Sequence, residues 1–156
     1  MKGGRRERGK MQEKETVNSY VLDTSALLTL WNDEEGSDTV EHLLRSGADG
    51  YVSFMTCMEG RYRIWKEAGR AESEEFSKYL GLLPVRRIDI TDEIFEKAIE
   101  IKATNSLSVC DSWIVATSVI TDSILVHKDP EFEQVGAIVE LRTLPYKLHK
   151  REKEKK

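Results

Sequence analysis

Short apolar runs alternate with amphipathic stretches along most of this chain, and no other feature restricts its fold as strongly. The runs are rich in β-branched and aromatic residues, as expected of strands, and lie at residues 17–23, 50–55, 85–90, 124–127 and 137–144. The stretches between them have apolar residues at helical spacing and lie at 24–31, 37–47, 56–69, 71–83, 91–105 and 108–121. Because helical crossovers of this length join parallel strands, we predict an α/β fold, a three-layer α/β/α sandwich with a mainly parallel sheet of four or five strands.

Polar residues and glycines set the predicted helix boundaries. Ser37 is the expected N-cap of the helix that stops at Gly47. Thr91 is expected to begin a capping box. The stretch at 108–121 is apolar on almost all sides, which is typical of a central helix covered by other elements.

The length of 156 residues fits one domain, and charge divides the chain into three parts. We predict a disordered basic arm over residues 1–16, a folded domain over 17–144 and a basic tail over 145–156. Residues 1–16 and 142–156 together hold 13 basic and 5 acidic side chains, whereas residues 17–141 hold 11 basic and 23 acidic ones. The folded part is therefore unsuited to holding a polyanion by a general basic field.

The apolar runs are too short to act as membrane spans or export signals. None approaches the roughly 18 residues of a span, and the basic start of the chain is followed by charged residues rather than an apolar signal segment. We therefore expect a cytoplasmic protein with no membrane partner. In that reducing compartment, Cys57 and Cys110 are expected to be small buried apolar residues rather than a disulfide or a zinc site.

Acidic residues fall where the predicted fold sends them to one edge of the sheet. Asp23 follows the first strand and Asp129 follows the fourth, while Glu59 and Asp111 lie near the starts of two helices. In open parallel sheets, ligands bind outside the carboxyl ends of the strands. Carboxylates that converge there repel one another unless a cation lies between them, and divalent cations prefer such oxygen ligands. The pattern indicates a site for a divalent metal ion.

Structural roles remain open for each of these residues. Capping of the following helix is the alternative for Asp23, and interaction with the helix dipole is the alternative for Glu59 and Asp111. The apolar neighbours of Asp23 and Asp111 favour a ligand role, because a buried ionised carboxylate needs a hydrogen bond, an ion pair or a metal. Ser25 is a candidate for holding Asp23 or a phosphate oxygen, with helix capping as its alternative.

With these residues in view, residues 17–144 resemble a PIN domain, and most closely the ribonuclease toxins of the VapC type. The resemblance rests on the order and spacing of the acids in VLDTSALL, TCMEGRY, DSWIVATS and HKDPEFEQV. Two residues depart from the family pattern. His127 stands where members often have Thr or Ser, and Lys128 adds a cation beside Asp129 that could weaken metal binding or contact phosphate.

The resemblance implies a metal-dependent endoribonuclease that leaves a 5′-phosphate and a 3′-hydroxyl. It implies that Mg²⁺ or Mn²⁺ is held by Asp23 and Asp111, with Asp129 as a direct or water-mediated ligand and Glu59 as a ligand or as the group that orients the water. Such a cation lowers the pKa of water and neutralises charge on phosphate oxygens. Toxins of this kind are usually homodimers silenced by a small antitoxin protein.

RNA contacts must come from individual basic or hydroxyl side chains, because the folded part is net negative. The candidates are Ser25, Lys128 and the two basic ends, together with Arg61, Arg63, Lys66, Arg86 and Arg87. A solvated helix surface is the alternative for Arg61, Arg63 and Lys66. Binding through such contacts should weaken steeply with salt.

Other functions are weighed against this interpretation. An Asp-nucleophile phosphatase would need Asp where Ser25 stands, the glycine-rich phosphate-binding motifs are absent, and His42, His127 and His149 have no evident Ser or Cys partner for a triad. Two alternatives stay open. One is a PIN-like module that binds RNA or protein without cutting, and the other is a housekeeping nuclease that processes rRNA or tRNA.

Overall fold

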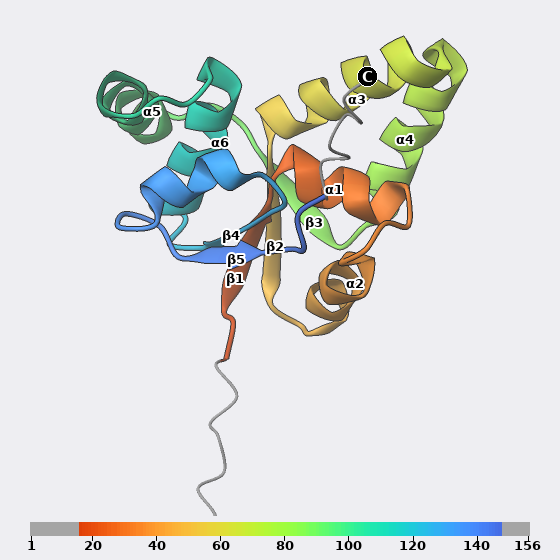
Figure 1. The fold of residues 1–156 in the computed structure, drawn as a ribbon, viewed down its shortest axis with the longest axis horizontal. Helices are drawn as coiled ribbons and strands as arrows, with labels where there is room; N and C mark the ends of the chain where they lie inside the picture. Colours follow the sequence, from red (N-terminus) through yellow and green to blue (C-terminus); the bar gives the residue numbers. More distant parts are fainter. Residues whose placement is uncertain (1–15, 148–156) are drawn as a thin grey trace, which may run out of the picture.

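Five parallel strands form one sheet in the order β3-β2-β1-β4-β5, in a computed structural model that describes residues 16–147 (Figure 1). The strands are β1 (Ser19–Leu22), β2 (Asp49–Ser53), β3 (Val85–Ile88), β4 (Ile124–His127) and β5 (Leu141–Thr143). In the centre, Val21 of β1 is paired with Tyr51 of β2 and with Leu125 of β4. The parallel sheet predicted from the alternating pattern is confirmed, and its last strand is shorter than the predicted run.

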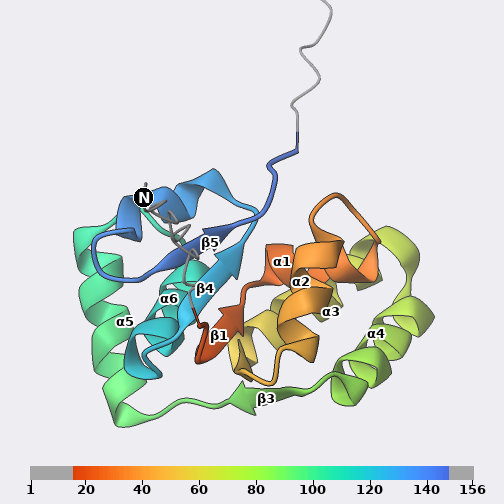
Figure 2. The same ribbon diagram turned by 90° about the horizontal axis from the view of Figure 1, so that it is seen from below.

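Helices cover both faces of the sheet, which confirms the three layers (Figure 2). One face carries α1 (Thr24–Trp31), α2 (Ser37–Arg45), α3 (Phe54–Ala68) and α4 (Arg70–Leu82). The other carries α5 (Asp92–Thr104), α6 (Val109–Ile120) and the short 3₁₀ helix η1 (Pro130–Val135). Alternate side chains of β1 enter the two cores, because successive residues of a strand point to opposite faces. Tyr20 and Leu22 pack under α1–α4, and Val21 packs under α5 and α6.

Side chains of the preceding residues begin most of the helices that reach the site. Ser53 accepts a hydrogen bond from Met55 N at the start of α3, and Ser108 accepts one from Asp111 N at the start of α6. Each bond satisfies a backbone donor that has no partner inside the helix. These caps fix the positions of the first turns of α3 and α6 relative to the sheet.

Two predicted helix starts are wrong in detail. Gly36 rather than Ser37 precedes α2, in a left-handed conformation with φ of 100° that favours glycine, and the Ser37 hydroxyl donates to Asp33 Oδ1 instead. Thr91 does cap α5 by accepting from Ile94 N. No reciprocal bond completes a capping box there, because the third helical position holds Ile94 rather than an acid or an amide.

The predicted arm over residues 1–16 and tail over 145–156 lie outside the described residues, except for Thr16 and residues 145–147. Within residues 16–147, no helix has the length and apolar character required to cross a membrane. Cys57 and Cys110 are both free thiols and are half-buried rather than fully buried.

Candidate functional site

The strand order reverses between β1 and β4, and this is where Asp23 and Asp129 lie. Asp23 directly follows β1, and its backbone amide donates to Val126 O of β4 at 3.1 Å. Asp129 lies two residues beyond the end of β4. Ligands of open α/β sheets bind at such a reversal, outside the carboxyl ends of the strands. The strand directions therefore bring the first and last predicted acids to the same edge.

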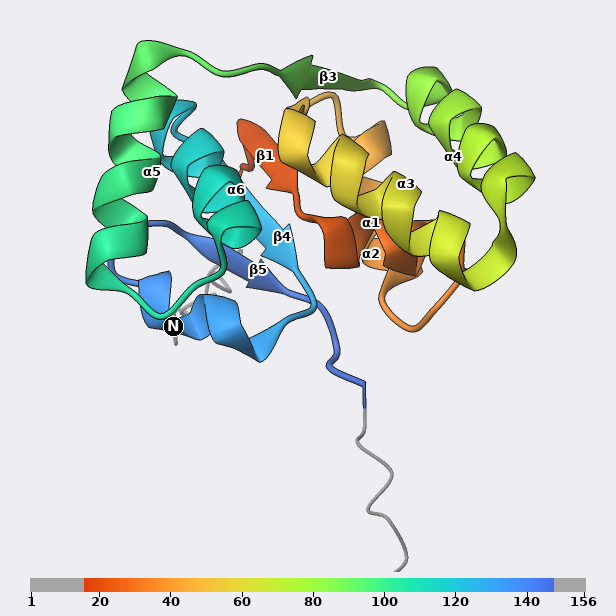
Figure 3. The same cartoon turned by 90° about the horizontal axis from the view of Figure 1, so that it is seen from above.

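Helices from both faces bring the other two acids to this edge. Figure 3 looks down on it, with α3 and α6 on either side of β1. Ligand atoms of Glu59 (α3), Cys110 and Asp111 (both α6) lie within 4.8 Å of one another, and so do carboxylate oxygens of Asp111, Asp129 and Glu131. Asp111 belongs to both groups and is the centre of the cluster.

Asp23 is the most buried member of the site, at 3% exposure. Its Oδ1 accepts hydrogen bonds from Ser25 Oγ at 2.6 Å and from Ala26 N at 2.9 Å, so it also caps α1. Burial raises the pKa of Asp23 to about 7, the two hydrogen bonds oppose the rise, and the charge of Asp111 adds to it. Asp23 is outside both close groups but interacts electrostatically with Asp111.

Asp111 is half-buried near the start of α6, and it does not cap the helix, since Ser108 does. Burial raises its pKa to about 6. The Ser108 hydrogen bond lowers this pKa, and the charges of Glu59, Asp129 and Glu131 raise it. Glu59 lies in the second turn of α3, beyond the first turn where the helix dipole acts most strongly. The dipole alternative therefore loses weight for Glu59.

Ser25 and Lys128, both predicted to contact substrate, are engaged within the protein. The Ser25 hydroxyl donates to Asp23 and accepts from the Lys128 backbone amide at 2.8 Å. The Lys128 ammonium pairs with Glu34 at 3.3 Å and donates to Glu35 O at 2.8 Å, with 5% of the side chain exposed. This placement argues against Lys128 as a phosphate contact. The Lys128 ammonium points to Glu34 rather than to the acidic cluster.

Sequence reasoning missed Glu131 and Cys110. Glu131 reaches the cluster because η1 begins directly after Asp129, whose Oδ1 accepts from Glu131 N at 3.0 Å. The signal was Pro130, a residue common at the first position of a helix. Cys110 was predicted as a buried apolar residue, yet its thiol lies beside Glu59 and Asp111, and burial together with these charges raises its pKa.

The predicted basic contacts are spread over the surface. Arg63 lines a groove of about 760 Å³ that reaches Asp129 and Glu131 and also includes Trp31, Glu67 and Tyr146. Arg61 Nε donates to Ser73 Oγ at 3.4 Å, and Lys66 is exposed on α3. Arg86 and Arg87 lie on β3 at the sheet edge, where Arg86 packs over Tyr51 and Arg87 pairs with Asp89.

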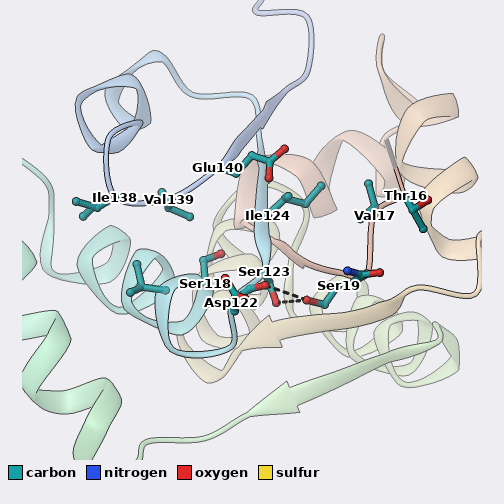
Figure 4. Close-up of a pocket in the computed structure, with 12 residues that line it drawn as sticks. Thr16, Val17, Ser19, Ser118, Asp122, Ser123, Ile124, Ile138, Val139 and Glu140 are labelled. Carbon is teal, nitrogen blue, oxygen red and sulfur yellow. Dashed lines mark hydrogen bonds between the residues drawn. The ribbon is translucent and has the colours of Figure 1, made fainter. Parts of the chain in front are cut away.

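A second cavity of about 420 Å³ lies at the opposite edge of the sheet, at the amino ends of β1 and β4 (Figure 4). Ser123 Oγ donates to Ser19 Oγ at 2.8 Å there, next to Asp122. The sheet separates this cavity from the four predicted acids.

The PIN domain family model matches residues 20–138 of this chain, which include β2, β3, β4, all of β1 but its first residue, and the whole acidic cluster. The chain belongs to the PIN domain family. No curated protein shows significant sequence similarity to it.

The PIN fold is shared with solved toxin–antitoxin proteins of low sequence identity. One is in the VapBC2 complex of Rickettsia felis bound to promoter DNA, with a TM-score of 0.68, 15% identity and coverage of 81% of this chain and 99% of that chain. Another is VapC20 of Mycobacterium tuberculosis, a sarcin–ricin loop cleaving toxin, with a TM-score of 0.64, 19% identity and coverage of 81% and 99%. A third is in a Klebsiella pneumoniae toxin–antitoxin complex, with a TM-score of 0.60, 19% identity and coverage of 83% and 99%.

The residues of this PIN domain fit a hard divalent cation. Asp111, Asp129 and Glu131 offer carboxylate oxygens within 4.8 Å of one another, and two oxygens on opposite sides of one Mg²⁺ are about 4.2 Å apart. The carboxylates are thus within reach of one ion or of its bound waters. Burial is the main cause of the raised pKa values of Asp23 and Asp111, and neighbouring carboxylates add to both, so a cation bound there would favour their ionised forms.

Proposed function

We propose that this PIN domain is a Mg²⁺- or Mn²⁺-dependent endoribonuclease, the toxin of a toxin–antitoxin pair. The observation that supports it is the convergence of Asp111 with Glu59, Asp129 and Glu131 where the strand order reverses. Membership in the PIN family and the fold shared with VapC proteins favour the same activity.

In this proposal the four predicted acids share two tasks. Asp23 and Asp111 would bind the cation, Asp129 would bind it directly or through water, and Glu59 would bind it or orient the attacking water. When bound, the cation lowers the pKa of water and stabilises negative charge on the phosphate oxygens. Ser25 keeps Asp23 in place, and the buried position of Asp23 restricts the directions from which water can approach it.

RNA would reach the acids along the groove that ends at Asp129 and Glu131. Arg63 lines this groove and is the basic residue best placed to contact phosphate. Because acidic side chains surround it, RNA binding should depend on a few ion pairs and weaken with salt. Replacing Arg63 with Gln should weaken RNA binding. It should also reduce the slope of log affinity against log salt concentration by about 1.

An antitoxin protein is the partner we propose. The solved structures that share this fold include VapBC and toxin–antitoxin complexes. A basic side chain of such a partner would enter the acidic cluster and take the place of the metal ion. We also propose that the toxin forms a homodimer. A housekeeping role in RNA processing would use the same chemistry, and it is distinguished by growth that does not depend on an antitoxin.

Cleavage of RNA by matched acid variants tests the activity. Asp111→Asn removes the charge shared by both acidic groups and should abolish Mn²⁺-dependent cleavage while the fold is kept. Asp122→Asn is the control, because Asp122 lies at the opposite edge with a φ of 51° that asparagine tolerates, and it should cut like the wild type. Wild-type cleavage by Asp111→Asn would overturn the proposal.

A further inference from the structure

His127 ends β4 and is fully buried, yet its ring makes a polar contact on each side. Nδ1 accepts a hydrogen bond from the backbone amide of Asp129 at 3.2 Å. Nε2 lies 3.1 Å from Thr143 Oγ1 on the edge strand β5. The ring therefore connects the loop that carries Asp129 to the outermost strand of the sheet.

These contacts define the state of the ring. A nitrogen that accepts an N–H carries no proton, so the proton of the neutral imidazole is on Nε2, from which it is donated to Thr143. In this state Nδ1 remains an acceptor aimed at Asp129.

The ring is also fixed by packing. Its centroid lies 5.3 Å from that of Phe132 in η1 and 6.3 Å from that of Tyr146. The backbone of the same residue is held as well, since His127 O accepts from Leu144 N at 2.7 Å. Turning the buried imidazole away from Asp129 would change these contacts with η1 and with the segment after β5.

The bond from the Asp129 amide spans two residues. Asn, Asp, Ser and Thr side chains form the same i to i+2 contact in tight turns. His127 thus supplies with a ring nitrogen the acceptor that a short polar side chain would supply at this position. Asp129 Oδ1 in turn accepts a hydrogen bond from Glu131 N. The orientation of the Asp129 amide therefore affects both Asp129 and Glu131.

The geometry points to His127 as a positioning residue that orients Asp129 and Glu131 for cation binding. This inference rests on the proposed function, because it assigns the cation to that same acidic cluster. It predicts that cation binding requires a hydrogen-bond acceptor at position 127 but does not require an imidazole ring. The departure of His127 from the family pattern would then leave the site competent.

Three variants separate the role of the hydrogen-bond acceptor from that of the ring. His127→Leu keeps an apolar side chain of similar size but removes the acceptor. His127→Asn restores an acceptor that can reach the amide two residues ahead. Thr143→Val removes the partner of Nε2 and leaves the Nδ1 contact with Asp129 in place. Mn²⁺ affinity of the free protein, RNA cleavage and NMR of the ring nitrogens and the Asp129 amide are the readouts.

We expect His127→Leu to lose about 10- to 100-fold in Mn²⁺ affinity and in kcat, as is typical when a group that orients a metal ligand is removed. His127→Asn should recover most of both, and Thr143→Val should lower the melting temperature while keeping Mn²⁺ affinity near that of the wild type. In the wild type, the NMR signal of Nδ1 should be that of an unprotonated acceptor.

The wild type alone decides whether the chain binds Mn²⁺ and cuts RNA, and the variants decide the role of His127. The inference is overturned if His127→Leu leaves both Mn²⁺ affinity and the Asp129 amide signal unchanged. It is also overturned if Nδ1 is protonated in the wild type, or if His127→Asn is as defective as His127→Leu while remaining folded.

Discussion

The hydroxyl of Ser25 donates a hydrogen bond of 2.6 Å to Asp23 Oδ1, and Ser25 Oγ accepts a hydrogen bond of 2.8 Å from the backbone amide of Lys128. One small side chain thus connects the residue after β1 to the loop after β4. The two strands are neighbours in the sheet, but the loops that follow them lie past the backbone hydrogen bonds that align the strands. Ser25 performs that alignment for the acids at the site.

Replacing Ser25 with Ala should weaken the site without unfolding the protein. The change removes the hydrogen bond that opposes the rise in the pKa of Asp23 and leaves the Lys128 amide without its partner. We expect about 10-fold weaker Mn²⁺ binding and a loss of about 1–3 kcal/mol in the free energy of unfolding. Ser25→Thr, which keeps the hydroxyl, is the control for calorimetric Mn²⁺ titration and urea unfolding. Equal Mn²⁺ binding by Ser25→Ala and the wild type would refute the role given to the hydroxyl.

The contribution of Asp23 to stability without divalent ions should fall as the pH rises from about 4 to about 7. In the unfolded chain Asp23 has a pKa of about 3.9, whereas in the folded protein its pKa is about 7. Between these values Asp23 binds fewer protons in the unfolded state, so its contribution to the free energy of unfolding decreases with pH and levels off above about 7. For a group as buried as Asp23 the decrease is on the order of 4 kcal/mol.

Urea unfolding of the wild type and Asp23→Asn across this range measures the effect. The difference in unfolding free energy between the two should change with pH as described, and Mn²⁺ should reduce the loss in the wild type because it binds the ionised carboxylates. A difference that stays constant from pH 4 to 8 would show that Asp23 ionises normally in the folded protein.

Two lysines that share one partner should differ in their effect on stability. Lys128 and Lys147 both pair with Glu34, but the Lys128 side chain is 5% exposed and that of Lys147 is 72% exposed. Lys128→Met should cost about 2 kcal/mol, less than the roughly 3–5 kcal/mol of a buried charge left alone, because Lys147 still pairs with Glu34. Lys147→Met should cost less than about 1 kcal/mol. Urea unfolding compares them, and equal losses would contradict the difference in burial.

Gly60 should be required for the contact between α3 and α4. A Cβ at this position would lie 2.8 Å from Cε1 of the Phe76 ring, whereas one at Gly81 would meet no atom within 4 Å. Gly60→Ala should destabilise the protein by about 1–3 kcal/mol through overpacking, and Gly81→Ala should stabilise α4 by about 0.5–1 kcal/mol. Thermal unfolding of the two variants checks this, and a neutral Gly60→Ala would mean that the Phe76 ring moves freely.

The sequence allowed the sheet and the first and last acids to be predicted for one physical reason. Strand direction alone places the residues that follow β1 and β4 at the carboxyl edge, so Asp23 and Asp129 needed no side-chain detail. Glu59 and Asp111 required the helix positions as well, and there the PIN resemblance supported the assignment. Their convergence follows from the contact between α3 and α6, which pack against β2 and β1 respectively.

Contacts between distant residues were beyond the reach of sequence patterns. The pairing of Lys128 with Glu34 spans 94 positions, so from the sequence the lysine beside Asp129 was predicted to contact phosphate or to weaken metal binding. Glu131 was missed because it reaches the cluster only through the turn of η1. The N-cap of α2 was misplaced because the left-handed turn at Gly36, rather than a polar side chain, starts that helix.

Thermal unfolding during a Mn²⁺ titration shows whether the acidic cluster binds a divalent cation, since a ligand that binds only the folded state raises the melting temperature by mass action. We expect a progressive rise in the wild type and in Asp122→Asn, and no rise in Asp111→Asn, whose carboxylate belongs to both close acidic groups. A wild-type melting temperature that Mn²⁺ does not change, or an equal rise in Asp111→Asn, would contradict this expectation.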